Sequence, residues 1–169
     1  MLYYILKIMT IFIKTSILDK ALFEFIERYN PNYFLTVQFP EHKKTENSEI
    51  SNNRLRIIMK NFERQLLGRY WNKHHLPFIC FAELGTSKMY HYHILFNSKD
   101  FKSEDIQSAL NKTTYQQKLP SYSLKLEQIV YNEEIVFVYC TKEIKIKNNN
   151  KFDSSKIITS HDLFDISVK

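Results

Sequence analysis

Two histidines and a glutamate in the middle of the sequence have the types and spacing of a metal site. His91 and His93 stand two residues apart in the β-forming run 90–96, so both imidazoles project from one face of a strand. Glu83 ends the preceding run 78–83, and a hairpin that pairs it with His91 brings the two Cβ atoms within about 5 Å. Two nitrogens and one oxygen suit Mg²⁺, Mn²⁺ or Zn²⁺, with other first-row metals as alternatives. The pattern therefore predicts a divalent cation that polarises a phosphate oxygen.

Further along the chain, Tyr139 and Lys142 have the spacing of a nucleophile and its cation. They share a face only in a helix, together with Ile135 and Val138. The surrounding residues are β-formers, so local propensity favours a strand. Asn132, with two glutamates after it, is typical of a helix start, and we predict a helix that presents Tyr139 and Lys142 toward the histidines. A phenol with a pKa near ~10 needs such a cation, a metal or a base to become a nucleophile at neutral pH.

Each pattern has an ordinary alternative. Two histidines in a strand are often plain packed or surface residues, and Tyr-x-x-Lys arises by chance in a chain with eleven tyrosines. The facial triad of non-haem iron oxygenases uses the same ligands, but it belongs to all-β barrels, and long helices here argue against it. The remaining histidines are expected to be surface residues: His42, His74, His75 and His161.

The elements that position these residues alternate between helices and strands. Ser51, Asn52 and Asn53 are candidate caps of the clearest helix, whose apolar stripe is Leu55, Ile58, Met59, Phe62, Leu66 and Tyr70. Hydrophobic periodicity predicts helices over 18–29, 51–70, 103–110 and 132–144, and strands over 33–39, 78–83, 90–96 and 121–130. This order indicates an α+β fold. We expect one domain over residues 1–169, with a core at about 33–145, a polar link and tail at 146–169, and an edge strand or helical flap in the opening run 1–13.

Composition narrows the function. The net charge of +6, with eleven Tyr and thirteen Phe, favours a polyanionic partner with unpaired bases. Only two glycines occur, which excludes a Gly-rich phosphate loop and an NTP-driven motor. Two cysteines, Cys80 and Cys140, form no disulfide framework, so we expect a reducing cytoplasm. The opening run is too short to span a bilayer and has no signal-peptide cleavage site, so no membrane partner is expected.

In order and spacing, three segments of the chain resemble the motifs of HUH endonucleases of the rolling-circle replication-initiator (Rep) type. They are Phe34-Leu35-Thr36-Val37, Glu83 with His91-Tyr92-His93, and Tyr139-Cys140-Thr141-Lys142. The resemblance implies a central antiparallel sheet of about five strands flanked by helices. It also implies Mg²⁺ or Mn²⁺ held by Glu83, His91 and His93, with Tyr139 forming a 5′-phosphotyrosine on single-stranded DNA and Lys142 orienting the nucleophile. Lys88 and Thr36 are expected to contact the nucleic acid, with Thr36 in the strand beneath the site.

The resemblance also implies partners. These are a single-stranded DNA origin or hairpin of a plasmid or virus and, because no helicase domain is expected in this chain, a host helicase and polymerase. The single tyrosine of the motif favours single-tyrosine initiators, and a dimer stays open. Three alternatives remain: a catalytically silent nucleic-acid-binding protein of the same fold, a single-strand transposase, and a metallonuclease that uses water instead of Tyr139.

Overall fold

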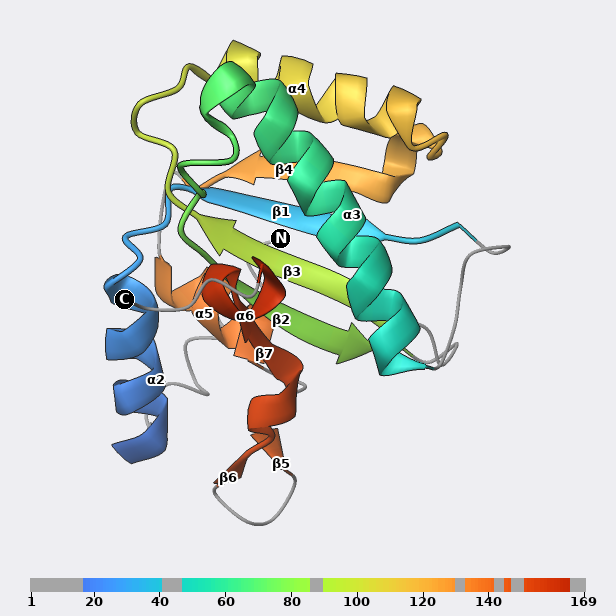
Figure 1. Cartoon of the computed structure of the whole chain (residues 1–169). Coiled ribbons are helices and arrows are strands. Elements are labelled where there is room, and N and C mark those ends of the chain that lie inside the picture. Colours follow the sequence, from blue (N-terminus) through green and yellow to red (C-terminus); the bar gives the residue numbers. More distant parts are fainter. Residues whose placement is uncertain are drawn as a thin grey trace, which may run out of the picture.

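A five-stranded antiparallel sheet forms the centre of the protein in the computed structural model, which describes residues 17–40, 47–85, 90–129, 133–141, 145–146 and 151–164 (Figure 1). The strand order is β4-β1-β3-β2-β7, and every neighbouring pair is antiparallel. The strands are β1 Tyr33–Gln38, β2 Phe78–Leu84, β3 Tyr90–Phe96, β4 Leu124–Gln128 and β7 Ile157–Thr159. This arrangement confirms the predicted α+β fold with a sheet of five strands.

Helices cover both faces of the sheet. Figure 1 shows α3 crossing in front of the strands, with α4 beside it, while α2 and α5 lie on the far side. The bounds are α2 Ile17–Glu27, α3 Ser48–Leu67, α4 Ser103–Gln116, α5 Glu133–Thr141 and α6 Ser160–Phe164. Short elements complete the described chain: η3 Gly68–Tyr70, η4 Ser121–Ser123, η5 Ser154–Lys156, and the pair β5 Lys145–Ile146 with β6 Lys151–Phe152.

The alternation of side chains along β3 divides the core into two clusters. Tyr92, Ile94 and Phe96 are fully buried against α3 and α4. Leu95 points to the opposite face, where it packs in a smaller cluster with residues of α2 and α5. His93 lies on that same face, because residues two apart on a strand share a face. The histidines therefore face the layer formed by α2 and α5.

Helix α3 begins earlier than its sequence predicts. Asn47 is the cap, and its side-chain oxygen accepts a hydrogen bond of 3.0 Å from the backbone N–H of Ile50. The predicted caps, residues 51–53, lie inside the helix. The buried stripe is otherwise as predicted, except that Tyr70 falls outside it and is 48% exposed. The reason is that Gly68 ends the helix with a positive φ of 57°, a conformation that favours glycine.

Other boundaries also differ from the sequence expectation. Helix α4 runs to Gln116 and not to 110, and β4 starts only at Leu124 because Tyr122 lies in the turn η4. The fifth strand of the sheet is β7, from the carboxyl-terminal region, which pairs with β2 through Cys80 opposite Ile158. The opening run 1–13 lies outside the described residues.

The carboxyl-terminal segment is part of the core. Leu163 of α6 is only 3% exposed, and its carbonyl oxygen accepts a hydrogen bond of 2.6 Å from Nε of Arg56 in α3. We expect Leu163→Ala to lower the free energy of unfolding by about 2–4 kcal/mol, since it removes buried methyl groups and leaves a cavity. Urea denaturation measures this change. Ile57→Ala, at a 52% exposed position of α3, is the control and should change it by less than about 0.5 kcal/mol. Equal effects of the two variants would contradict a structural role for the segment.

Candidate metal and tyrosine site

The hairpin of β2 and β3 has the register that the metal hypothesis requires. Glu83 lies opposite His91, and Phe81 lies opposite His93. The Glu83 side chain reaches across to the second histidine, and its Oε2 lies 2.8 Å from His93 Nε2. Pattern and turn length therefore predicted the pairing correctly, and the carboxylate contacts an imidazole directly.

Strand β1 holds His93 from the other side. Thr36 lies opposite His93 in the register, and Thr36 Oγ1 is 3.5 Å from His93 Nδ1, a long contact for a hydrogen bond. The Phe34 ring stacks on the imidazole, with centroids 5.5 Å apart and an interplanar angle of 12°. His93 is 3% exposed, so its ring orientation is set by packing as well as by polar contacts. Sequence reasoning missed Phe34, although its position two residues before Thr36 places both side chains on the histidine face.

His91 supplies a buried nitrogen whose polar needs are unmet. Its Nε2 atom is inaccessible to solvent and has no hydrogen-bond partner among the residues that the structure describes. A buried polar atom of this kind costs about 1–3 kcal/mol unless a partner satisfies it. The neighbours of His91 across the sheet are Glu83 on β2 and Gln38 on β1. A ligand on the histidine face would therefore stabilise His91 as well as bind to it.

The donor set fits a small divalent cation, although it does not form a closed cage. Within the described ranges no three His, Cys, Asp or Glu side chains are gathered closely enough to hold a metal. The 2.8 Å between Glu83 Oε2 and His93 Nε2 is close to the roughly 3 Å that separates adjacent donors about 2.1 Å from one octahedral cation. With the unsatisfied Nε2 of His91, these groups make a candidate site that needs only side-chain movement to close.

Tyr139 lies beside this candidate site. Its ring centroid is 5.1 Å from that of His93, at an interplanar angle of 72°, and it also meets Phe34 edge-on at 6.0 Å. The side chain is 46% exposed, so the phenol is accessible to a large substrate. The predicted partner Lys142 and the predicted nucleic-acid contact Lys88 both lie outside the described residues, so their places stay predictions.

The segment that carries Tyr139 is a helix, as the chemistry required and as local propensity opposed. Helix α5 packs Cys140, 3% exposed, into the cluster of α2 and the sheet, with Val136 and Val138 partly buried beside it. Burial of this face compensates for the modest cost of β-branched residues in a helix, which is a few tenths of a kcal/mol for each residue. The side chain of Ile135, expected to share this face, lies outside the described set.

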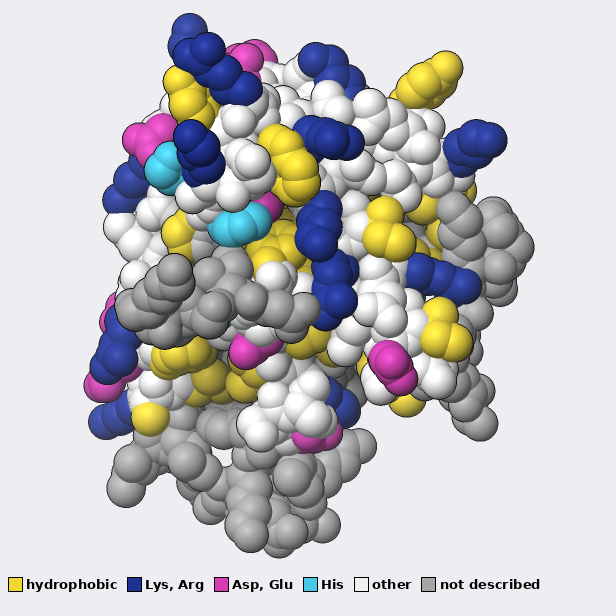
Figure 2. Space-filling view, in the orientation of Figure 1, with side chains coloured by type: hydrophobic (Ala, Val, Ile, Leu, Met, Phe, Trp, Pro, Cys, Tyr) yellow, Lys and Arg dark blue, Asp and Glu magenta, His cyan; other side chains and the backbone are white. Residues whose placement is uncertain are grey.

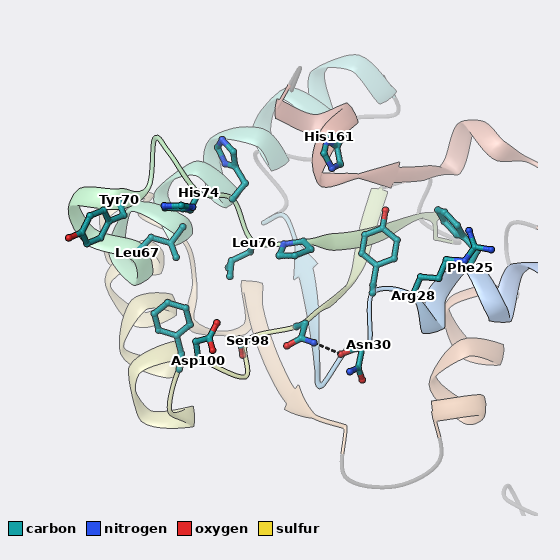
Figure 3. A pocket seen from close by; sticks show the side chains of 15 residues that line it. Phe25, Arg28, Asn30, Leu67, Tyr70, His74, Leu76, Ser98, Asp100 and His161 are labelled. Carbon is teal, nitrogen blue, oxygen red and sulfur yellow. Dashed lines mark hydrogen bonds between the residues drawn. The ribbon is translucent and has the colours of Figure 1, made fainter. Parts of the chain in front are cut away.

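A large hollow lies elsewhere, at the opposite end of the sheet (Figure 3). Its volume is about 1080 Å³, and its walls include Tyr70, His74, Asn97, Asp100 and His161. Asn97 directly follows the end of β3, about 13 Å along the strand from His93 at 3.3 Å per residue. The hollow contains none of the predicted metal ligands and not Tyr139, so size alone does not locate the candidate site.

One histidine beside this hollow is not the plain surface residue that the sequence suggested. His75 is partly buried, and its Nδ1 lies 2.8 Å from Oε2 of the fully buried Glu63. The other carboxylate oxygen of Glu63 accepts a hydrogen bond of 2.9 Å from the backbone N–H of Leu76. Burial raises the pKa of Glu63, and these hydrogen bonds oppose the rise. His74 and His161 are exposed, as predicted.

The sheet and its site define a class of protein: an α+β domain with two histidines on a central strand and a tyrosine helix packed over them. The profile of a family of replication-associated proteins, the ORF2 family, matches residues 32–145, which include every described element from β1 to α5. The chain belongs to this family of Rep-type replication-associated proteins. No curated protein and no solved structure gives a significant match. Across the described ranges, the helices are too short or too polar to cross a bilayer.

Proposed function

We propose that this protein is a metal-dependent, site-specific endonuclease and strand transferase that acts on single-stranded DNA. It would nick an origin through a 5′-phosphotyrosine on Tyr139 and so initiate rolling-circle replication, or mobilisation, of a plasmid or virus. Membership of a replication-associated family supports the biological setting. The contact between the rings of Tyr139 and His93, 5.1 Å apart, is the observation on which the chemistry depends, because it joins the two predicted halves of the site.

In the proposed reaction the Tyr139 oxygen attacks the scissile phosphorus. A bond forms between the phenol oxygen and phosphorus, the bond from phosphorus to the 3′ oxygen breaks, and the leaving strand takes a proton to become a 3′-hydroxyl. A divalent cation, Mg²⁺ or Mn²⁺, bound by Glu83, His91 and His93 would polarise the phosphate oxygens. Lys142 would orient the phenol or balance charge at the phosphate. Because the phosphotyrosine keeps the energy of the cut linkage, a later 3′-hydroxyl displaces Tyr139 and reseals the strand without ATP.

Thr36 has a more specific role in this proposal than contact with DNA. Its hydroxyl faces His93 Nδ1, so an interaction there would fix the tautomer that leaves Nε2 available as a metal ligand. We expect Thr36→Val, which keeps the shape and removes the hydroxyl, to weaken Mn²⁺ binding by about tenfold. Thermal melting at increasing Mn²⁺ measures the affinity. Thr114→Val in α4, which loses a hydrogen bond to the Leu110 carbonyl, is the control and should leave the affinity unchanged. An unchanged Mn²⁺ affinity in Thr36→Val would contradict the role.

The experiment that tests the function is selection of cleaved molecules from a randomised single-stranded DNA library with Mn²⁺ or Mg²⁺. We expect cut products with a free 3′-hydroxyl and a 5′ end that remains attached to protein through denaturing electrophoresis. The recovered sequences also give the recognised nucleotides. Cleavage without any attached protein would replace the covalent mechanism by hydrolysis.

A second candidate is a nucleic-acid-binding protein of the same fold without catalysis. One observation favours it: Glu83 and His93 contact each other directly, and no ready three-donor cage exists among the described residues. The two candidates differ in their response to metal. The enzyme is stabilised by Mn²⁺ through its histidines, whereas the silent protein binds DNA equally with and without metal.

A further inference from the structure

The excess positive charge of this protein is concentrated in a single stretch of the chain. Residues 51–73 contain six Lys and Arg and one Glu, a net charge of +5, while the whole chain has 24 Lys and Arg, 18 Asp and Glu and a net charge of +6. Outside this stretch the 18 remaining cations nearly balance 17 acids. The stretch forms most of α3, the turn η3 and the residues directly after it. We propose that this surface binds the phosphate backbone of duplex DNA that flanks the single-stranded cleavage site.

The cations form a continuous row on the outer side of α3. Arg56, Lys60 and Arg64 follow one another at intervals of four residues, which places them along one side of a helix. Lys60 and Arg64 are exposed, and Figure 2 shows Lys and Arg side chains following the line of α3 across the molecule. The single acid of the stretch, Glu63, is fully buried and bonded to His75, so it does not oppose a phosphate at the surface.

Aromatic rings support the arginines at one end of the row. The guanidinium of Arg64 lies 5.1 Å from the centroid of the Trp71 ring. That of Arg69 lies 4.9 Å from the centroid of the Tyr70 ring and donates a hydrogen bond of 2.7 Å to its hydroxyl. Stacking limits the rotamers of these long side chains, so less entropy is lost when they bind a phosphate. We define the basic track as Lys60, Arg64, Arg69 and Lys73.

The helix that bears the track is fixed to the end of the sheet that holds the candidate site. Near the start of α3, Asn52 Oδ1 accepts a hydrogen bond of 2.8 Å from the Tyr92 hydroxyl, and Tyr92 lies between His91 and His93 on β3. From there the helix runs toward the end of the sheet where β2 begins. The track lies on the α3 face and Tyr139 on the α5 face, so the two surfaces contact different parts of one DNA molecule.

The form of the track fits a duplex better than a single strand. Sites for single strands combine a charged groove with exposed rings on which bases stack. Helix α3 is convex, and along its described length the exposed large apolar residues are Ile50 and Ile57, neither of them aromatic. A rigid cationic helix presents charge to phosphates and cannot stack on bases, which positions a duplex without reading its sequence. From residue 60 to 73 the row would span up to about 20 Å at 1.5 Å per residue, or about six base pairs.

Salt dependence of binding tests the proposal with metal chelated, so that the result does not depend on cleavage. The test variant is Lys60→Gln/Arg64→Gln/Arg69→Gln, and the matched control is Lys20→Gln/Lys99→Gln/Lys112→Gln, three exposed lysines on other elements. Fluorescence anisotropy with a labelled 20-base-pair duplex gives the affinity at several salt concentrations. We expect the slope of log affinity against log salt to become shallower by about 2–3 for the test variant, because each lost phosphate contact removes about 0.9. The control should keep the wild-type slope within about one.

Each other outcome counts against the track as a duplex site. Equal losses in the test variant and the control would show non-specific attraction by net charge. A loss for a single strand of the same sequence but not for the duplex would assign the surface to single-stranded DNA. Lys60→Gln alone, at an exposed position, provides a second measurement if the triple variant is unstable, with an expected change in slope of about 0.9. Wild-type nicking with an unaltered duplex slope in the variants would overturn this inference and leave the proposed function intact.

Discussion

Replacing Tyr139 by phenylalanine is expected to abolish the covalent protein–DNA adduct and to lower cleavage of single-stranded DNA by about 10³-fold or more. The substitution removes only the attacking oxygen and keeps the ring that packs edge-on against Phe34 and His93. Loss of a nucleophile typically costs this much or more, because binding and the remaining polar groups provide only residual catalysis. Electrophoresis of a labelled oligonucleotide under denaturing conditions measures adduct and product together.

Tyr115→Phe is the matched control for this substitution. Tyr115 lies on α4 and is 85% exposed, and α4 packs on the face of the sheet opposite to Tyr139. Its loss of a hydroxyl should leave the adduct and the cleavage rate within about twofold of wild type. Robust cleavage by Tyr139→Phe would rule out the covalent mechanism, and a protein-free cut end would then select attack by water.

The second large effect concerns metal binding. If Mn²⁺ binds at Glu83, His91 and His93, a concentration 100 times the dissociation constant stabilises the folded protein by about 2.7 kcal/mol. For a domain of this size that corresponds to a rise in melting temperature of about 5–10 °C. We expect Glu83→Gln and His91→Gln each to remove most of this rise, because each loses one of three donors. Differential scanning fluorimetry with and without Mn²⁺ measures the difference, and it needs no DNA substrate.

His74→Gln is the control for the metal experiment. His74 is exposed and lines the hollow at the other end of the sheet, so its substitution should keep the full stabilisation by Mn²⁺. Wild-type protein without any shift at saturating Mn²⁺ would favour the silent binding protein over the enzyme. A shift that persists in both site variants would place the metal elsewhere.

Local pattern predicted the hairpin because both of its strands are close in sequence. Alternation put His91 and His93 on one face, and the short connection from Glu83 left few registers to choose from, so the pairing of Glu83 with His91 was predicted correctly. The buried stripe of α3 followed from its helical period in the same way. The start of that helix was predicted less well, because Asn47 and residues 51–53 all have side chains that are able to cap, and sequence does not rank them.

Contacts between distant segments decided the rest. The stacking of Phe34 on His93 joins β1 to β3, and the fifth strand comes from Ile157–Thr159, a stretch too short for periodicity to indicate a strand. The nature of α5 shows the division most clearly. From its residues alone the segment around Tyr139 favours a strand, and the spacing of Tyr139 and Lys142 only states what catalysis would require. The folded chain makes it a helix because Cys140 and its apolar neighbours are buried against α2 and the sheet, and that burial outweighs a local preference of a few tenths of a kcal/mol per residue.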